Sequence, residues 1–337
     1  MTTRPTGLLV MGTRAYTQQF GPAELARLRA LVDLPDPVYL ERLDTPQARE
    51  RLRDVEVIVS SWGCPAIDDV TLAVAPRLRG IFHAAGTVRS LTTEAMWDRG
   101  ITLTTSASVN ALPVAEFTLG AAILAGKRAP FLGAAATEQR TDWFHDRDRF
   151  GVASNRDVTI GIIGLSRIGR LVVELLRPLG WRVLVCDPVV SEAEIRAAGA
   201  EPASLDDLLR AGDIISIHAP DLPSTHHMIG ARQLRLMRDH ATLINTARGR
   251  LVDTEALTHE CVSGRLNAML DVTDPEPLPF TSPLYRLPNV MLTPHIAGSQ
   301  GPETRRMSAH AIDELERFLR GEPVMSQVVR DAMAVMA

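Results

Sequence analysis

Short apolar runs alternate with longer amphipathic segments over most of the chain. Short runs bounded by polar residues, Gly or Pro are typical of buried parallel strands, and amphipathic segments of helix length are typical of the helices that cover them. This alternation predicts an α/β fold. In the first hundred residues we expect a helix over 22–32 and strands at 8–11, 55–60, 78–84 and 101–104.

A second unit shows the same pattern with six apolar runs. It is preceded by the segment VAEFTLGAAILAGKR (114–128), which is apolar nearly all round and so predicts a helix buried between two bodies that connects them. After Pro294 we expect a helix over 302–320, no further strand material for a third domain, and a tail that returns to the first unit. The six strands, which suit a doubly wound sheet, are expected at 158–163, 181–186, 214–217, 242–245, 268–271 and 290–292.

Composition narrows the class of protein. Hydrophobic residues make up 45% of the 337 residues, which is enough for two cores, and the net charge of -4 comes from interspersed acids and bases. Without a basic block, nucleic acid is not an expected partner. The three cysteines lie far apart and form no CxxC pair, so we expect neither a disulfide framework nor a metal site. No uninterrupted apolar run has membrane-span length and the first residues lack a signal-peptide layout, so we expect no membrane association and a cytoplasmic location.

The run VTIGIIGLSRIGRLVVELL has the order strand, glycine turn, helix start that a dinucleotide pyrophosphate requires. As a G-x-G-x-x-G pattern it consists of Gly164, Ser166 and Gly169, so a serine replaces the second glycine. The next strand ends in Asp187, 18 residues after Gly169, where a carboxylate can accept the ribose hydroxyls. No arginine follows closely, which favours NAD over NADP. For the glycine run the alternative interpretation is an ordinary strand-turn-helix. For Asp187 it is a turn-forming Asp-Pro.

Three further segments, INTARGRLVD, LDVTDPEP and LTPHIAGS, follow predicted strands. They therefore lie at the carboxyl edge, where open α/β sheets bind ligands. Arg248 can hold a carboxylate in bidentate fashion, and His295 beside the carboxylate of Glu276 is stabilised as an imidazolium that can give up a proton. Taken singly, each residue favours a role without chemistry: Arg248 a surface ion pair, Glu276 a solvated loop acid and His295 a cap before the last helix. Their joint occurrence after a nucleotide-binding pattern favours hydride-transfer chemistry.

With GIIGLSRIG, CDP, SIHAP, NTARG, LDVTDPEP and TPHIAGS in this order, the chain resembles the D-isomer-specific 2-hydroxyacid dehydrogenases. The resemblance implies NAD as cofactor, a small 2-oxo or 2-hydroxy acid as substrate, and Arg248, Glu276 and His295 as catalytic residues. It also implies a homodimer formed through the nucleotide domain. The implied cofactor-binding residues are Gly164, Ser166, Arg167, Ile168, Gly169, Asp187, His218, Ala219, Pro220, Thr225, Thr246, Ala247, Asp271 and Asn110. For Asn110 a helix N-cap is the alternative.

Family members also hold the substrate carboxylate with backbone amides of a glycine-rich loop, which here corresponds to Ala85, Gly86 and Thr87, alongside Arg248 and His295. This loop, FHAAGTVRS, departs from the family pattern because the usual second glycine and the Asp-Asn-Ile-Asp run after it are absent. His83 and Arg89 could contact a larger or more acidic substrate, but a surface role is favoured for both.

The predicted architecture is two doubly wound domains. A Rossmann dinucleotide-binding domain (105–296) is inserted into a smaller flavodoxin-like substrate domain (1–104 plus 297–337). Within this scaffold the alternatives are phosphoglycerate dehydrogenase, although many such enzymes carry an extra regulatory domain, and a phosphite dehydrogenase, which keeps the same triad. Formate dehydrogenases on this scaffold generally carry glutamine in place of Glu276, which counts against formate as the substrate. A non-catalytic NAD(H)-sensing binding protein is the alternative from another class.

Overall fold

The computed structural model of the chain describes residues 4–139 and 147–334. It divides into two compact units, Met1–Asn110 with Ser299–Ala337, and Ala111–Gly298. These boundaries lie six and two residues beyond the predicted ones, because the first turn of the connecting helix is still bound to the first unit. There the Ser299 N–H donates to Asn110 Oδ1 at 2.9 Å.

The sheet of unit 1 has the strand order β13-β5-β4-β3-β1-β2. All its pairings are parallel except that of β13 with β5. Without β13 the order is 2-1-3-4-5, which is flavodoxin-like. The strands are β1 (Gly7–Val10), β2 (Tyr39–Leu40), β3 (Val57–Ser60), β4 (Gly80–His83), β5 (Thr102–Thr105) and β13 (Gln327–Val328).

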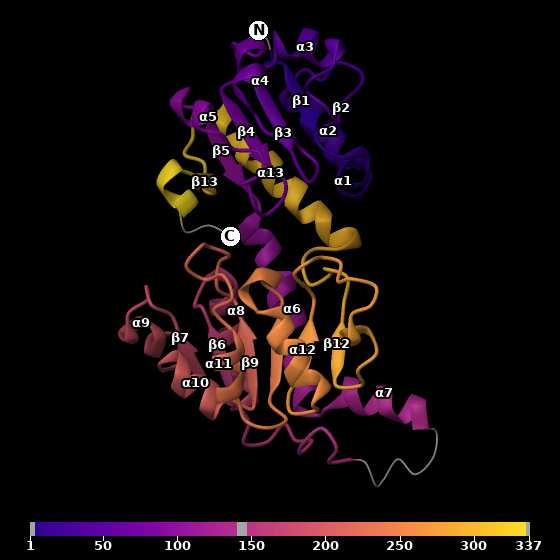
Figure 1. Cartoon of the computed structure of the whole chain (residues 1–337). Coiled ribbons are helices and arrows are strands. Elements are labelled where there is room, and N and C mark those ends of the chain that lie inside the picture. The colour runs from indigo at the N-terminus through magenta and orange to yellow at the C-terminus, as the bar shows by residue number, and fades with distance from the viewer. Residues whose placement is uncertain (1–3, 140–146, 335–337) are drawn as a thin grey trace. The chain divides into compact units, whose positions relative to one another are not determined.

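Helices cover both faces of this sheet (Figure 1). One apolar core joins the sheet to the helix near the end of the chain, through Phe82, Ala311 and Leu315, and the other contains Leu72 and Met96. The chain therefore returns to unit 1 after building unit 2. The helices are α1 (Thr13–Gln19), α2 (Pro22–Leu31), α3 (Pro46–Leu52), α4 (Asp69–Val74), α5 (Glu94–Asp98) and α13 (Thr304–Leu319).

Unit 2 contains a seven-stranded parallel sheet of order β12-β11-β10-β9-β6-β7-β8. Its strand order matches the doubly wound dinucleotide fold, whose ligand crevice opens where the order reverses, here between β6 and β9. The strands are β6 (Thr159–Ile163), β7 (Arg182–Cys186), β8 (Glu201–Pro202), β9 (Ile214–Ile217), β10 (Thr242–Asn245), β11 (Asn267–Leu270) and β12 (Val290–Leu292). The helices are α6 (Ala107–Gly126), α7 (Ala129–Gln139), α8 (Arg167–Leu176), α9 (Glu192–Ala197), α10 (Leu205–Ala211), α11 (Ala231–Leu236) and α12 (Thr254–Val262).

Three strands escaped the sequence pattern: β2, β8 and β13 are two residues long, too short to show any period. The strand after Pro294, β13, pairs with β5 in the sheet of unit 1 and forms no third domain. Helix α6 begins seven residues before the predicted start at Val114, because Pro113 lies inside the helix rather than at its first turn.

Helix α6 is also, among the described residues, long and apolar enough by composition to cross a membrane. Half of the tested window is buried inside the protein. Ala115, Ala122 and Ala125 belong to the core of unit 2, and the Thr118 hydroxyl lies 3.0 Å from that of Thr246. These are the contacts of a core helix.

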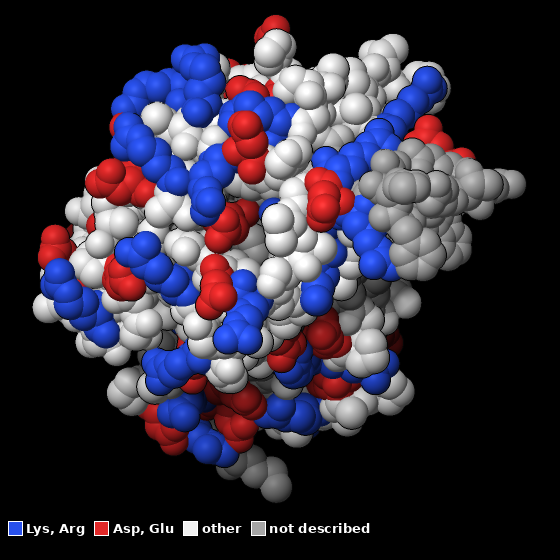
Figure 2. Space-filling model, turned by 90° about the horizontal axis from the view of Figure 1, so that it is seen from below, with Lys and Arg blue, Asp and Glu red and all other residues white. Residues whose placement is uncertain are grey.

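Acidic and basic side chains are interspersed with uncharged ones on the face that Figure 2 presents. Ion pairs of the described residues include Arg182 with Glu201 at 2.7 Å and Arg232 with Asp206 at 2.5 Å. Such mixed surfaces give no extended field of one sign.

Candidate active site

The glycine turn after β6 requires two of its glycines. Gly164 has a φ of 94°, and a Cβ there would lie 2.8 Å from the Ala219 nitrogen. A Cβ on Gly169 would lie 2.2 Å from the Gly164 carbonyl oxygen. The turn therefore brings the start of α8 and the loop after β9 together, as close packing around a pyrophosphate requires.

Ser166, in place of the second glycine, is the N-cap of α8. Its backbone is extended, with φ of -63° and ψ of -178°, so a side chain causes no strain. The Gly169 N–H donates to its hydroxyl at 3.4 Å. The first amides of a helix have no intrahelical acceptor, so those of Arg167 and Ile168 remain available to an anion at this end.

Asp187 connects the end of β7 to the glycine turn. The Leu165 N–H donates to its Oδ2 at 2.7 Å, and the Val189 and Val190 N–H groups donate to Oδ1 at 2.9 and 3.2 Å. The turn-forming role considered above is therefore present. The carboxylate also lies beside the predicted phosphate site, and its contact with the ribose stays a prediction.

The loop after β9 carries the next four predicted residues. His218 is buried, with Nε2 2.9 Å from the Ser216 hydroxyl and no partner at Nδ1 among the described residues. Burial lowers the pKa of His218 to about 4, so the ring is neutral at neutral pH. Ala219 closes on Gly164, and the Thr225 hydroxyl donates to the Pro220 carbonyl at 2.6 Å. Thr225 thus stabilises its own loop.

The turn after β10 presents Arg248. Asn245 shapes this turn: the Ala247 N–H donates to its Oδ1 at 3.0 Å, and its Nδ2 donates to the Arg248 carbonyl at 2.8 Å. Thr246 is buried against Thr118. We did not single out Asn245 from the sequence, although its place before Thr-Ala-Arg was the available signal.

Arg248 is partly buried, and Nη1 donates to the Ala247 carbonyl at 2.6 Å. Burial lowers the pKa of Arg248, and the nearby carboxylates of Asp221 and Glu276 act in the opposite direction. The guanidinium stays charged because its ordinary pKa lies far above neutral. It is therefore a cation beside two acids, with most of its donors uncommitted within the described part of the chain.

Gly249 brings the next loop close to this turn. A Cβ there would lie 2.0 Å from the Thr273 carbonyl, so only glycine permits the approach. Thr273 belongs to the loop after β11, and Glu276 follows three residues later. The glycine thus brings the segment of Glu276 beside that of Arg248.

His295 and Glu276 form an ion-pair contact, with Nδ1 2.7 Å from Oε1. Their side chains are 52% and 43% exposed, so both can meet a ligand. The ring is oriented through Nδ1, which leaves Nε2 for proton transfer. His295 has a φ of 54°, the left-handed region that few such residues adopt.

Asp271 holds the loop that contains His295. Its buried carboxylate accepts from the Thr293 hydroxyl at 2.6 Å and from the amides of Ile296 and Ala297 at 2.8 and 2.9 Å. The His295 N–H donates to the Asp271 carbonyl at 3.0 Å. Asp271 is thus a positioning residue; its predicted contact with the nicotinamide amide stays a prediction.

The predicted substrate loop of unit 1 follows β4. The Thr105 hydroxyl donates to the carbonyls of Ala85, at 2.9 Å, and of Gly86. His83 is 4% exposed and lies 2.9 Å from the Ser60 hydroxyl through Nδ1, so the surface role favoured for it was wrong. Burial lowers its pKa to about 4, against a hydrogen bond with the Thr87 backbone. His83 fixes the loop from inside.

Two further residues of unit 1 flank this loop. Arg89 is exposed and donates to the Met333 carbonyl at 2.8 Å. Asn110 lies inside α6, 3.9 Å from a Cβ placed on Gly86, and receives the Ser299 N–H. The N-cap alternative for Asn110 was wrong, because α6 begins three residues earlier.

Comparison with known proteins identifies the family. Residues 121–297 match the sequence model of the D-isomer specific 2-hydroxyacid dehydrogenase NAD binding domain. The chain belongs to this family. Its NAD-binding domain is therefore the part that carries Gly164, Arg248, Glu276 and His295, and the chain is an NAD-dependent oxidoreductase of the 2-hydroxyacid dehydrogenase type.

The chain is similar to several curated proteins and solved structures. A glyoxylate reductase of Korarchaeum cryptofilum is 33% identical over 81% of this chain and 82% of its own. A D-3-phosphoglycerate dehydrogenase of Methanocaldococcus jannaschii is 32% identical over 81% of this chain, which spans only 51% of that relative. Among solved structures, a D-lactate dehydrogenase of Aquifex aeolicus complexed with NAD and lactic acid has a TM-score of 0.72 and 26% identity, covering 94% of this chain and 96% of that one.

Proposed function

We propose that the chain reduces small 2-oxo acids of glyoxylate or hydroxypyruvate type to D-2-hydroxy acids with NADH. The observation that carries this proposal is the 2.7 Å pair of His295 with Glu276 on the strand edge that also bears Arg248. The three residues follow β12, β11 and β10, which are adjacent parallel strands. Their loops therefore lie at one edge of the sheet.

The residues of the glycine turn fit a dinucleotide. Gly164 and Gly169 leave no room for side chains, and the amides of Arg167 and Ile168 at the start of the ten-residue helix α8 can bind phosphate oxygens. The carboxylate of Asp187 would accept hydrogen bonds from the hydroxyls of the adenosine ribose. When bound, NADH supplies the hydride that adds to C2 of the substrate.

The protein supplies the rest of the chemistry. Arg248 binds the substrate carboxylate and polarises the adjacent carbonyl. His295 donates the Nε2 proton to the carbonyl oxygen as C2 is reduced, and accepts it back in the oxidative direction. Glu276 holds the ring through Nδ1 and stabilises its positive charge. Asp271 fixes the loop so that the ring stays in place.

NADH oxidation at 340 nm against a panel of 2-oxo acids tests this proposal. The panel contains glyoxylate, hydroxypyruvate, pyruvate, phenylpyruvate, 2-oxoisocaproate and 2-oxoglutarate, with NADPH in parallel. We expect turnover of the smallest members and a preference for NADH. If NADH binds but no 2-oxo acid of the panel is reduced, the proposal is contradicted. Phosphite oxidation or cofactor sensing is then favoured.

We also propose that the enzyme is a homodimer formed through α6 and α7. Leu124 is 45% exposed on α6, beside the partly buried Ile123, and Gly120 and Gly133 have no neighbour within 4 Å of a Cβ. Glycine inside a helix costs stability, and its missing side chain leaves room for another backbone to approach. This apolar, small-residue face suits a second copy of the chain.

Light scattering tests the dimer. The proposal predicts twice the 36.8 kDa chain mass, and a Leu124→Glu variant should give the single mass. Val262→Glu, at a 56% exposed position on α12, is the matched control and should stay dimeric. A wild-type mass of one chain would contradict the proposal.

The cytoplasmic location is also a proposal, and fractionation of cells that express the full chain tests it.

A further inference from the structure

Asp221 lies beside the arginine turn, although its sequence position gives no hint of this. It follows Pro220 in the loop after β9, and this loop runs along the segment after Arg248. The His227 N–H donates to the Arg250 carbonyl at 2.8 Å, and the Ile229 N–H donates to that of Leu251 at 3.1 Å. The two loops are thus held together by backbone hydrogen bonds.

The Asp221 carboxylate lies near the guanidinium of Arg250 and acts electrostatically on that of Arg248. Its Oδ2 lies 4.0 Å from Nη1 of Arg250, and its side chain is 24% exposed against 59% for Arg250. It also acts on Arg248, where it opposes the effect of burial on the pKa of that guanidinium. Asp221 is therefore a partly buried acid within electrostatic reach of the residue expected to hold the substrate carboxylate.

The charges around Arg248 bear on specificity. Two carboxylates, those of Asp221 and Glu276, act on its guanidinium. A substrate carboxylate pairs with Arg248, whereas a second anionic group brings a further negative charge close to Asp221. Like charges close together in a partly buried site are costly.

We propose that Asp221 is a specificity-determining residue that makes the site prefer 2-oxo acids with one negative charge over those with a second anionic group. This inference rests on the proposed function and narrows it. It favours a glyoxylate- or hydroxypyruvate-like substrate over a phosphorylated one. Discrimination of this kind arises from a repulsive element rather than from tighter binding of the preferred substrate.

The test compares hydroxypyruvate with 3-phosphohydroxypyruvate, which differ by one phosphate group. Both are measured with saturating NADH, so that any change in cofactor affinity cancels in the ratio of their kcat/KM values. We expect wild type to favour hydroxypyruvate by about tenfold or more, and Asp221→Asn to lower this ratio about tenfold through the KM of the phosphorylated substrate. Added salt should reduce the difference between the two proteins.

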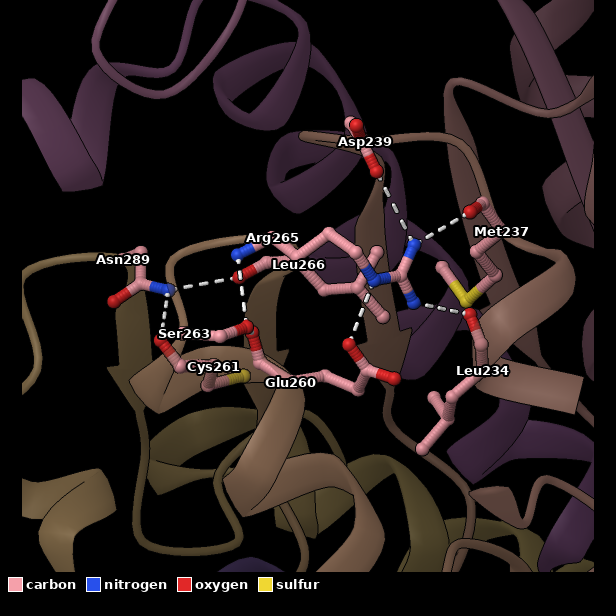
Figure 3. Close-up of polar contacts among 9 residues, drawn as sticks. All are labelled: Leu234, Met237, Asp239, Glu260, Cys261, Ser263, Arg265, Leu266 and Asn289. Carbon is pink, nitrogen blue, oxygen red and sulfur yellow. Dashed lines mark hydrogen bonds and ion pairs between the residues drawn. The ribbon is translucent and has the colours of Figure 1, made fainter. Parts of the chain in front are cut away.

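Asp239→Asn is the matched control. Asp239 belongs to the same unit and its substitution removes the same charge, but it precedes β10 and so lies at the opposite edge of the sheet, 3.5 Å from Arg265 (Figure 3). In Asp239→Asn the ratio of the kcat/KM values for the two substrates should stay within about twofold of wild type. Asp221→Ser gives the same readout if the asparagine variant fails to fold.

Three results would overturn the inference. They are an unchanged ratio in active Asp221 variants, a wild-type preference for the phosphorylated substrate, and an equal shift in Asp239→Asn. Failure of the proposed function has a different signature, because wild type would then turn over neither substrate nor any other 2-oxo acid of the panel.

Discussion

Two arginines at opposite edges of the unit 2 sheet are used in contrasting ways. Arg265 donates to the carbonyls of Leu234 and Met237 at 2.6 and 2.7 Å, and to the carboxylates of Glu260 and Asp239 at 2.7 and 3.5 Å (Figure 3). The guanidinium of Arg248 makes one hydrogen bond among the described residues, to the carbonyl of its neighbour Ala247.

The difference separates a structural arginine from one that awaits a ligand. Arg265 donates to carbonyls at the end of α11 and to the carboxylate of Glu260 near the end of α12, and so joins the two helices. Most N–H donors of the Arg248 guanidinium make no hydrogen bond within the described part of the chain, although burial lowers the pKa of this group. An ionised group that is partly buried and little satisfied by the protein marks a binding site.

The largest expected effect is on catalysis. Arg248→Met should lower kcat/KM for hydroxypyruvate about a thousandfold, because the carboxylate and the developing negative charge lose their bidentate partner. The midpoint of urea unfolding should change little, since Arg248 makes few internal bonds. Steady-state kinetics and urea titration measure both quantities. Activity within tenfold of wild type would remove Arg248 from the site.

Arg265→Met should give the reverse result. Four contacts are lost and the carboxylate of Glu260, only 12% exposed, loses its partner. The free energy of unfolding should fall by about 2 kcal/mol. The kcat/KM should stay within about twofold of wild type at temperatures where the variant is folded. A large loss of activity with unchanged stability would break the comparison.

The sequence predicts some features of the fold and the candidate site and misses others. The motif residues from Gly164 to His295 could be predicted because strand, turn and helix signals are local and place them at carboxyl strand ends. The role of Asp221 could not, since its partners Arg248 and Arg250 are distant in sequence. The burial of His83, the last residue of β4, was missed because the residue type histidine gives no burial signal, and β13 was missed because two residues have no period.

Buried histidines give the next effect, this time on stability. Burial lowers the pKa of His218 and of His83 from 6.5 to about 4, so each is neutral when folded. Below pH 6.5 the unfolded chain binds protons that the folded one does not, so the free energy of unfolding should fall as the pH drops toward 4. Urea titrations over this range measure the fall. It should be shallower in His218→Asn, and an identical slope would contradict the role of burial.

The smallest expected effect concerns the serine in the glycine turn. Ser166→Gly should lower the free energy of unfolding by only a few tenths of a kcal/mol, because glycine is itself an acceptable N-cap. The dissociation constant for NADH, followed by fluorescence, should change less than about threefold, since the backbone at this position is already extended. A tenfold change would show that the hydroxyl contacts the cofactor.

The most direct test of the assignment is a paired measurement on His295→Gln: turnover of hydroxypyruvate and the dissociation constant for NADH. Because the ring acts on the substrate and not on the dinucleotide phosphates, turnover should fall at least about a thousandfold while NADH affinity stays within about twofold. Turnover near the wild-type rate would contradict the account.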